Sequence, residues 1–197
     1  LSQGQRPTER IVSLGGPAAR APKMVRTRPG ADLEQLCLGE AEATQPRFVN
    51  GSAIWGHVAS VEEHTAFIGR WNTQVTLLED GVSRDLIGWA LPISGRFTQT
   101  NTVWDKFFRK AFKYDTDTNG SLRAIVPIGQ YESVMPMDVL ATQLIKALAA
   151  KDLESAEKLG VLELSEEDLA LCQVVDPSKV PITDWLRDML TTIEKEG

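Results

Sequence analysis

Cysteine and histidine are scarce in this 197-residue sequence, which holds two of each. Cys37 and Cys172 lie far apart, so a disulfide framework is not expected and a reducing, cytosolic compartment is favoured. With so few histidines, general acid–base chemistry would depend on carboxylates, and spacing singles out none of them. Walker A, G-x-G-x-x-G, G-x-S-x-G and C-x-x-C motifs are also missing. We therefore expect no catalytic residue in this chain.

Long apolar runs are missing too. None approaches the roughly 18–20 residues that a membrane span needs, so no transmembrane span of its own is expected. The net charge of −6 argues against nucleic acid as a partner, because phosphate binding needs clustered Lys and Arg. Residues 1–9 are polar, which predicts a disordered linker and no signal peptide. Since no initiator Met is present, we expect a fragment of a longer protein.

The composition that is present, 42% hydrophobic and 24% charged, is ordinary for a soluble globular protein. Residues 10–92 are predicted to form a β-grasp domain. Ile11–Leu14 and Lys23–Arg28 flank Gly and Pro residues, which predicts a hairpin, and Asp32–Leu36 is typical of a short helix. Further strands are predicted at Phe48–Val49, Gln74–Leu78 and Leu86–Ala90. A hairpin, a short helix and more strands follow one another in the order of a β-grasp fold.

Residues 93–130 are predicted to be a connecting segment with a helix and a hairpin. Thr102 can cap a helix from Val103 to about Phe112. The Asn119–Gly120 turn then leads into a strand-like run at Arg123–Ile128.

Residues 131–197 are predicted to be a helical domain that follows the β-grasp domain, which makes the fold class α+β. The predicted helices are Met137–Ala150, Asp152–Leu159, one that begins at the capping box of Ser165 and Asp168, and one with Pro181 in its first turn. Four short helices with brief connections predict a small bundle.

Four positions in this domain are spaced like the ligands of an iron–sulfur cluster. A bacterial ferredoxin run is C-x₂-C-x₂-C-x₃-C-P. In that register the slots fall on Glu166, Leu169, Cys172 and Asp176, with Pro177 in the trailing position. One thiolate cannot hold a cluster that needs four sulfur ligands, so we expect no metal here. The motif is interpreted as vestigial, with the former electron carrier used as a scaffold.

Two other groups contain metal-type ligands. Asp115–Gly120 matches the first half of an EF-hand loop, but the required Glu at position 12 is replaced by Val126, which favours a polar hairpin. The second group does not have the spacing of an H-E-x-x-H helix, which favours a solvated loop. Its members are His57, Glu62, Glu63 and His64.

Two further features have a functional and a structural interpretation. Val103–Lys113 interleaves aromatic and basic residues, which suits docking to an acidic lipid surface or a partner, but a helix that packs its aromatics into its own core is commoner. Cys172 could be a reactive thiol. Three acids precede it and would raise the pKa of that thiol, so a half-buried structural cysteine is favoured.

Several separated motifs resemble one family, the A-subunit of the sodium-translocating NADH:quinone oxidoreductase. They appear in the same order and cover nearly the whole chain, which makes the resemblance specific. The matching stretches are Leu14–Pro17, Met24–Leu33, Thr118–Ser121, Val126–Pro136, Leu162–Cys172 and Ile193–Gly197.

The resemblance implies that the chain is the C-terminal part of a longer protein. It implies a β-grasp domain of the soluble-ligand-binding type and a helical domain similar to the cluster-bearing domains of the NADH-oxidising subunit of complex I and of the C-subunit of the Rnf complex. Family members often have a second Cys before the proline, where this chain has Asp176.

The family's complex oxidises NADH, reduces ubiquinone and exports sodium across the bacterial inner membrane. The A-subunit is its peripheral, cytoplasmic component and has been connected with quinone, whereas the flavins and iron–sulfur centres belong to other subunits. The resemblance therefore implies a component of an enzyme, with no cofactor bound by this fragment. Its implied partners are integral-membrane subunits and ubiquinone. No catalytic residue can be transferred, and the cofactor-binding residues stay unknown.

Three functions are therefore open: an assembly and docking subunit, direct quinone binding in a cleft lined by Trp104, Phe107 or Phe108, and a stand-alone β-grasp module that binds a small ligand without a redox role.

Overall fold

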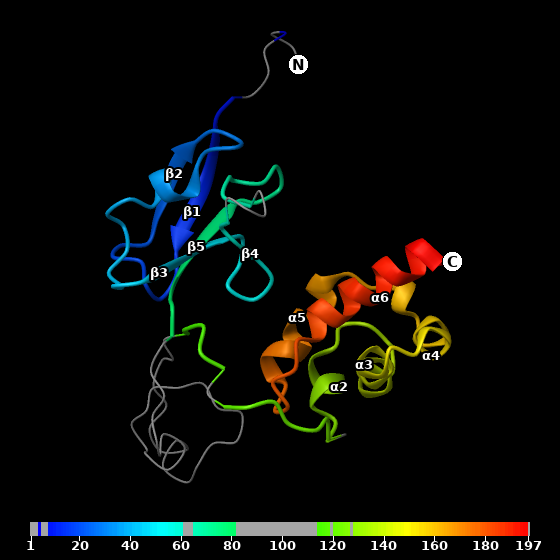
Figure 1. Cartoon of the computed structure of the whole chain (residues 1–197). Coiled ribbons are helices and arrows are strands. Elements are labelled where there is room, and N and C mark those ends of the chain that lie inside the picture. Colours follow the sequence, from blue (N-terminus) through cyan, green and yellow to red (C-terminus); the bar gives the residue numbers. More distant parts are fainter. Residues whose placement is uncertain are drawn as a thin grey trace. The chain divides into compact units, whose positions relative to one another are not determined.

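The computed structural model divides into two compact units, Leu1–Asp117 and Thr118–Gly197, which are considered separately below. The structure describes residues 4, 8–60, 65–81, 114–118, 120–126 and 128–196. Figure 1 shows that the strands belong to the first unit and that nearly all the helices belong to the second. The predicted α+β class is confirmed. The domain bounds predicted at residues 92 and 131 stay predictions.

The first unit is built on a mixed five-stranded sheet with the strand order β2-β1-β5-β3-β4. The central pair, β1 and β5, is parallel, and the other neighbours are antiparallel. The elements of this unit are β1 (Arg10–Gly15), β2 (Lys23–Thr27), α1 (Leu33–Leu36), β3 (Pro46–Asn50), β4 (His57–Val58) and β5 (Gln74–Glu79).

The predicted hairpin is confirmed by the antiparallel pairing of β1 with β2. Alternation along β1 places Val12 and Leu14 in the core, whereas Ile11 is exposed. The predicted short helix is also confirmed as α1, and the Asp32 carboxylate accepts a hydrogen bond from the Gln35 amide at 3.0 Å. The core under the sheet consists of Val12, Leu14, Ala18, Leu33, Cys37, Ile68, Val75 and Leu77.

The chain returns to the end of β5 at residues 114–117. Thr116 Oγ1 donates to the Asp80 carboxylate at 2.7 Å and accepts from the Gly81 amide at 3.0 Å. A Cβ on Gly81 would lie 2.6 Å from the Cβ of Asp117, so the two backbones are in close contact. The described residues on either side of the stretch 82–113 are therefore in contact at the end of β5.

The second unit is helical and has a core of its own. Its elements are α2 (Gln130–Val134), α3 (Ala141–Ala150), α4 (Leu153–Lys158), the 3₁₀ turn η1 (Val161–Glu163), α5 (Glu166–Val175) and α6 (Ile182–Glu196). Leucine, isoleucine and alanine side chains from α3, α5 and α6 form most of this core, and Tyr131 of α2 joins them.

The helix ends largely follow the sequence. Asp152 caps α4 through the Ser155 amide, and Ser165 with Asp168 forms the predicted capping box of α5. Pro181 immediately precedes α6, where its missing N–H costs no hydrogen bond.

Two predictions in this unit are wrong. The helix predicted from Met137 begins only at Ala141, and the separate helix α2 was missed. The Glu132 carboxylate of α2 accepts from the Thr142 amide at 2.9 Å, so a residue distant in sequence caps α3. The second error is the strand at Arg123–Ile128.

The described residues of that second stretch, 123–126 and 128, form no strand. The Arg123 amide instead donates to the Ser178 carbonyl at 2.9 Å, and Ile125 packs on the helical core. Of the described residues of this run, Ile125 alone is partly buried, whereas Val126 and Ile128 are exposed.

Three predicted features lie outside the described residues: the strand at Leu86–Ala90, the helix at Val103–Phe112, and the group Glu62, Glu63 and His64. Among the helices that the structure does describe, none combines the length and the apolarity that crossing a bilayer requires.

Candidate functional site

The four cluster-spaced positions follow α5 to its C-terminal cap, and they have different environments. Leu169 and Cys172 are fully buried in the helical core. Glu166 forms an ion pair with Arg187 of α6 near the surface. Asp176, the cap of α5, is 7% exposed. Among the described residues, no three His, Cys, Asp or Glu side chains come together to hold a metal ion.

Asp176 is the centre of a buried hydrogen-bond cluster. Its Oδ1 accepts from the Tyr131 hydroxyl at 2.6 Å and from the Ser178 amide at 2.8 Å. Its Oδ2 accepts from the Val180 amide at 2.8 Å. The three donors satisfy both oxygens of this buried carboxyl group. Asp176 thus joins α2, α5 and the turn that leads into α6.

The turn after α5 also forms hydrogen bonds with the segment at the start of the helical unit. Ser178 Oγ donates to the Ala124 carbonyl at 3.1 Å, and the Lys179 ammonium donates to the Thr118 carbonyl. Lys179 has a φ of 61°, a left-handed conformation that is unusual for a residue with a side chain. The Asp176 cluster therefore also fixes the segment at the start of the helical unit.

Cys172 lies beside the same cluster. Its sulfur is 3.8 Å from the Tyr131 carbonyl and 3.9 Å from the Met135 sulfur. Burial, and then the negative charge of Glu132, raises the pKa of this thiol to about 11. The raised pKa was predicted, but its attribution to the three preceding acids is wrong. Cys172 is also fully buried rather than half-buried.

Tyr131 was not singled out from the sequence as a site residue. Burial, and then the hydrogen bond to Asp176, raises the pKa of its hydroxyl. The available signal was weak: Tyr131 is one of two tyrosines in the chain and stands in a stretch that carries the family resemblance.

Both free cysteines are expected to react with a disulfide reagent such as DTNB at about pH 8 at least ~100-fold more slowly in the native protein than in guanidinium chloride. Burial raises the pKa of Cys37, as it does that of Cys172, from 9.0 to about 11, which lowers the thiolate fraction by about that factor. Stopped-flow absorbance measures both rates, and a Cys37→Ser variant assigns the remaining signal to Cys172. A native thiol that reacts at the unfolded rate would contradict the buried environment.

The stretch Asp115–Gly120, which resembles the first half of an EF-hand loop, forms turns and contacts the end of β5. Asp115 Oδ1 accepts from the Asp117 amide at 3.0 Å, and Thr116 is bonded to Asp80. Gly120 has a φ of 157°, and Val126 is exposed. His57 lies exposed in β4.

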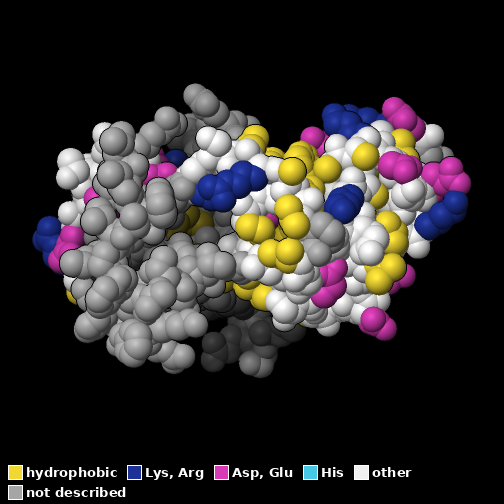
Figure 2. Space-filling view, turned by 90° about the horizontal axis from the view of Figure 1, so that it is seen from below, with side chains coloured by type: hydrophobic (Ala, Val, Ile, Leu, Met, Phe, Trp, Pro, Cys, Tyr) yellow, Lys and Arg dark blue, Asp and Glu magenta, His cyan; other side chains and the backbone are white. Residues whose placement is uncertain are grey.

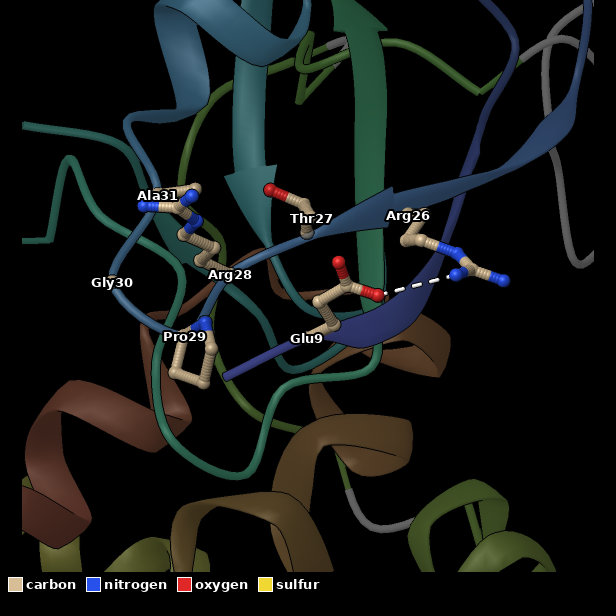
Figure 3. Close-up of a pocket in the computed structure, with 7 residues that line it drawn as sticks. All are labelled: Glu9, Arg26, Thr27, Arg28, Pro29, Gly30 and Ala31. Carbon is tan, nitrogen blue, oxygen red and sulfur yellow. Dashed lines mark hydrogen bonds and ion pairs between the residues drawn. The ribbon is translucent and has the colours of Figure 1, made fainter. Parts of the chain in front are cut away.

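The first unit has an open hollow of about 460 Å³ at the turn between β2 and α1. Figure 3 shows Arg26 turned toward Glu9, to which it is hydrogen-bonded at 3.2 Å, and Arg28 turned away from that pair. The residues that line the hollow are Glu9, Arg26, Thr27, Arg28, Pro29, Gly30 and Ala31. Guanidinium groups and a hydroxyl suit an anionic group.

Hydrophobic side chains also reach the surface. On the face drawn in Figure 2 they gather in patches beside Lys and Arg side chains. In the first unit the most exposed large ones among the described residues are Trp71, Leu38 and Met24, and in the second Leu122 and Leu162.

Comparison with known proteins places these features in a family. A family model described as "NQRA C-terminal domain" matches residues 11–60. The Na(+)-translocating NADH-quinone reductase A-subunit of Hahella chejuensis is 45% identical over all of this chain and 44% of its own length. The chain belongs to this A-subunit family. The predicted resemblance is thereby confirmed.

Other A-subunits of this reductase align over nearly the same extent. That of Klebsiella pneumoniae subsp. pneumoniae is 47% identical over 96% of this chain and 42% of its own length. That of Rhodopirellula baltica is 43% identical over all of this chain and 43% of its own length. The chain therefore spans less than half the length of these curated relatives.

Proposed function

We propose that this chain is the C-terminal part of the peripheral subunit of a sodium-translocating NADH:quinone reductase, where it acts in assembly and contributes to quinone access. The observation that carries the proposal is the identity of 43–47% to proteins named as the A-subunit, over 96% or more of the chain. Its partners would be the integral-membrane subunits and ubiquinone, on the cytoplasmic side of the bacterial inner membrane. The complex would couple NADH oxidation to sodium export.

The first unit is proposed to be a β-grasp domain and the second a small helical bundle. The hairpin followed by α1, and the order β2-β1-β5-β3-β4 with a parallel central pair, support the first assignment. The shared core of the helices supports the second.

A scaffold role for the helical unit is supported by the contacts at the cluster-spaced positions. Where a cluster would need thiolates, this chain has an ion pair, two core side chains and the hydrogen-bonded Asp176. We propose that the fragment binds no cofactor of its own. Its ultraviolet–visible spectrum is then expected to lack iron–sulfur and flavin bands, and such a band with matching iron would overturn the scaffold role.

Co-purification tests the assembly role directly. An affinity-tagged protein that contains this chain is expected to bring down the membrane subunits from native membranes, with sodium-dependent NADH:quinone reductase activity. Crosslink mapping would identify the faces in contact. Recovery of the tagged protein alone from gently solubilised membranes would contradict the assembly role and would favour a stand-alone ligand-binding module.

Cys172→Ser is expected to leave assembly and electron transfer of the complex unchanged while lowering the free energy of unfolding by about 1–2 kcal/mol, because a hydroxyl replaces a buried thiol. Denaturation of the isolated chain and NADH:quinone reductase assays of the complex give the two readouts. Loss of electron transfer with normal assembly would show that this thiol has a redox role.

Replacing residues 82–113 by a short Gly-Ser linker is expected to leave both units folded, because Gly81 and Asp117, on either side of this stretch, are close together. The stretch includes Trp104, Phe107 and Phe108, proposed as the quinone-contacting residues. Titration of a soluble ubiquinone analogue should quench tryptophan fluorescence saturably in the full chain and not in the shortened one. Equal quenching in both would rule out these residues, and no saturable quenching in the full chain would rule out quinone binding by it.

A further inference from the structure

Four arginines and two aromatic residues lie at one end of the sheet unit, where β1 begins and β2 ends. We call this surface the arginine–aromatic rim. Its members are Arg10, Arg26, Arg28, Phe67, Arg70 and Trp71.

Hydrogen bonds hold the two halves of the rim together. The Arg10 guanidinium donates to the Gly69 carbonyl at 3.1 Å and to the Arg70 carbonyl at 2.7 Å. The Gly30 amide donates to the Ile68 carbonyl at 3.1 Å. The loop that carries Phe67 and Trp71 is therefore fixed beside the turn that carries Arg28.

The rim is locally cationic on a chain whose net charge is −6. Arg26 is paired with Glu9 at 3.2 Å, and Asp32 at the edge of the rim is engaged as the cap of α1. Within the described part of the chain, neither Arg28 nor Arg70 forms an ion pair with a carboxylate. The hollow of about 460 Å³ opens between Arg26 and Arg28 (Figure 3). The rim is therefore complementary to a negatively charged group or surface.

The aromatic members are unusually exposed for side chains of their size. Trp71 is 83% and Phe67 is 50% exposed. The Arg70 guanidinium lies 5.3 Å from the centre of the Trp71 ring. Tryptophan and arginine share a preference for the boundary between hydrocarbon and water, where the apolar part is buried and the polar end stays hydrated.

We propose that the arginine–aromatic rim is a docking surface for a bilayer that contains anionic phospholipids. Arg28 and Thr27 receive a headgroup phosphate in the hollow, beside the Arg26–Glu9 pair, while Trp71 and Phe67 enter the interfacial region. Free guanidinium groups explain the attraction to the charged surface, and the exposed rings explain why the partner has an apolar layer beneath the charge. The inference concerns lipid contact by this unit and does not depend on the quinone reductase assignment.

Sedimentation of the full chain with vesicles tests the proposal. Binding is expected to vesicles of phosphatidylcholine with phosphatidylglycerol and to be much weaker with phosphatidylcholine alone. The variant Arg28→Gln/Arg70→Gln should lose about 25-fold in partition coefficient, from roughly fivefold for each arginine near an anionic surface. Arg20→Gln/Arg123→Gln is the matched control, because it removes the same charge from exposed positions outside the rim and should change binding little.

Quenching by brominated lipids reports which tryptophan enters the membrane. The Trp71→Phe variant should lose the quenchable fraction of the fluorescence, whereas Trp185→Phe, which replaces a partly buried residue of the helical core, should retain it. Circular dichroism of each variant confirms that the fold is kept.

Equal vesicle binding by the rim variant and the control, or quenching that survives Trp71→Phe, would overturn the proposal. The proposal would also be overturned if the chain did not bind anionic vesicles but was retained on an acidic peptide, and if the Arg28→Gln/Arg70→Gln variant lost that retention. This result would favour an acidic protein partner.

Discussion

Replacing Asp176 by alanine is expected to lower the free energy of unfolding of the helical unit by about 3–5 kcal/mol. The substitution leaves the Tyr131 hydroxyl and the amides of Ser178 and Val180 without an acceptor in a buried place. Each unsatisfied buried donor costs about 1–3 kcal/mol, and water that enters the space recovers part of the loss. Denaturation followed by circular dichroism, with the two units resolved, measures the effect.

Two variants separate the parts of this loss. Asp176→Asn keeps one acceptor oxygen and should cost less than alanine, whereas Tyr131→Phe removes one donor and should cost about 1 kcal/mol. The double variant Tyr131→Phe/Asp176→Ala should cost less than the sum of the single changes, because the two groups share a bond. Asp188→Ala on the exposed side of α6 is the control and should stay within about 0.5 kcal/mol. A loss no greater than that of Asp188→Ala would show that the cluster does not stabilise the unit.

Gly16→Ala is expected to destabilise the sheet unit by about 3 kcal/mol or more. A Cβ at Gly16 would lie 2.3 Å from the Leu77 carbonyl oxygen and 2.8 Å from the Leu77 nitrogen, and both atoms belong to the backbone of β5. Gly16 also has a φ of 118°, which side chains rarely adopt. A backbone cannot move aside as a flexible side chain can, so the parallel β1–β5 pairing must be distorted.

The neighbouring glycine provides a matched control. Gly15→Ala adds the same methyl group one residue earlier, where φ is ordinary and the nearest atom is the Pro22 Cβ at 3.8 Å. Its effect should stay within about 1 kcal/mol. Thermal unfolding of both variants compares them directly. Equal stabilities for Gly15→Ala and Gly16→Ala would mean that the close approach of Gly16 to the β5 backbone does not require a glycine.

The vestigial cluster motif shows what could and could not be predicted from residue spacing. The pattern from Glu166 to Asp176 identified positions on one helix and its cap, and it predicted that a single cysteine could not hold a cluster. It treated Asp176 as a missing ligand. The three donors to its carboxylate come from residues 131, 178 and 180. No local sequence pattern predicts that Tyr131, which is distant in sequence, forms a hydrogen bond with Asp176.

Local chemistry determined much of the fold. Alternation and the Gly-Gly-Pro turn predicted the β1–β2 hairpin, acidic residues in the first turn predicted α1, and the capping box of Ser165 and Asp168 predicted the start of α5. These features depend on residues within a few positions of one another, so a sequence window contains the whole cause. The start of α3 depends on Glu132 and the path of residues 123–126 depends on Ser178, both of which lie outside a window of a few residues, and there the predictions were wrong.

The sequence by itself determined the α+β class, the approximate positions of β1, β2, α1, β3 and β5, and the family to which the chain belongs. The tertiary structure alone decided that Asp176 is a buried hydrogen-bond centre, that Gly16 must be glycine, and that the segments carrying Arg10, Arg28 and Arg70 lie side by side. The physical reason is the sequence separation over which each interaction acts. Caps and alternation act between neighbours, whereas burial, close backbone approach and the clustering of charge arise only when folding brings distant residues together.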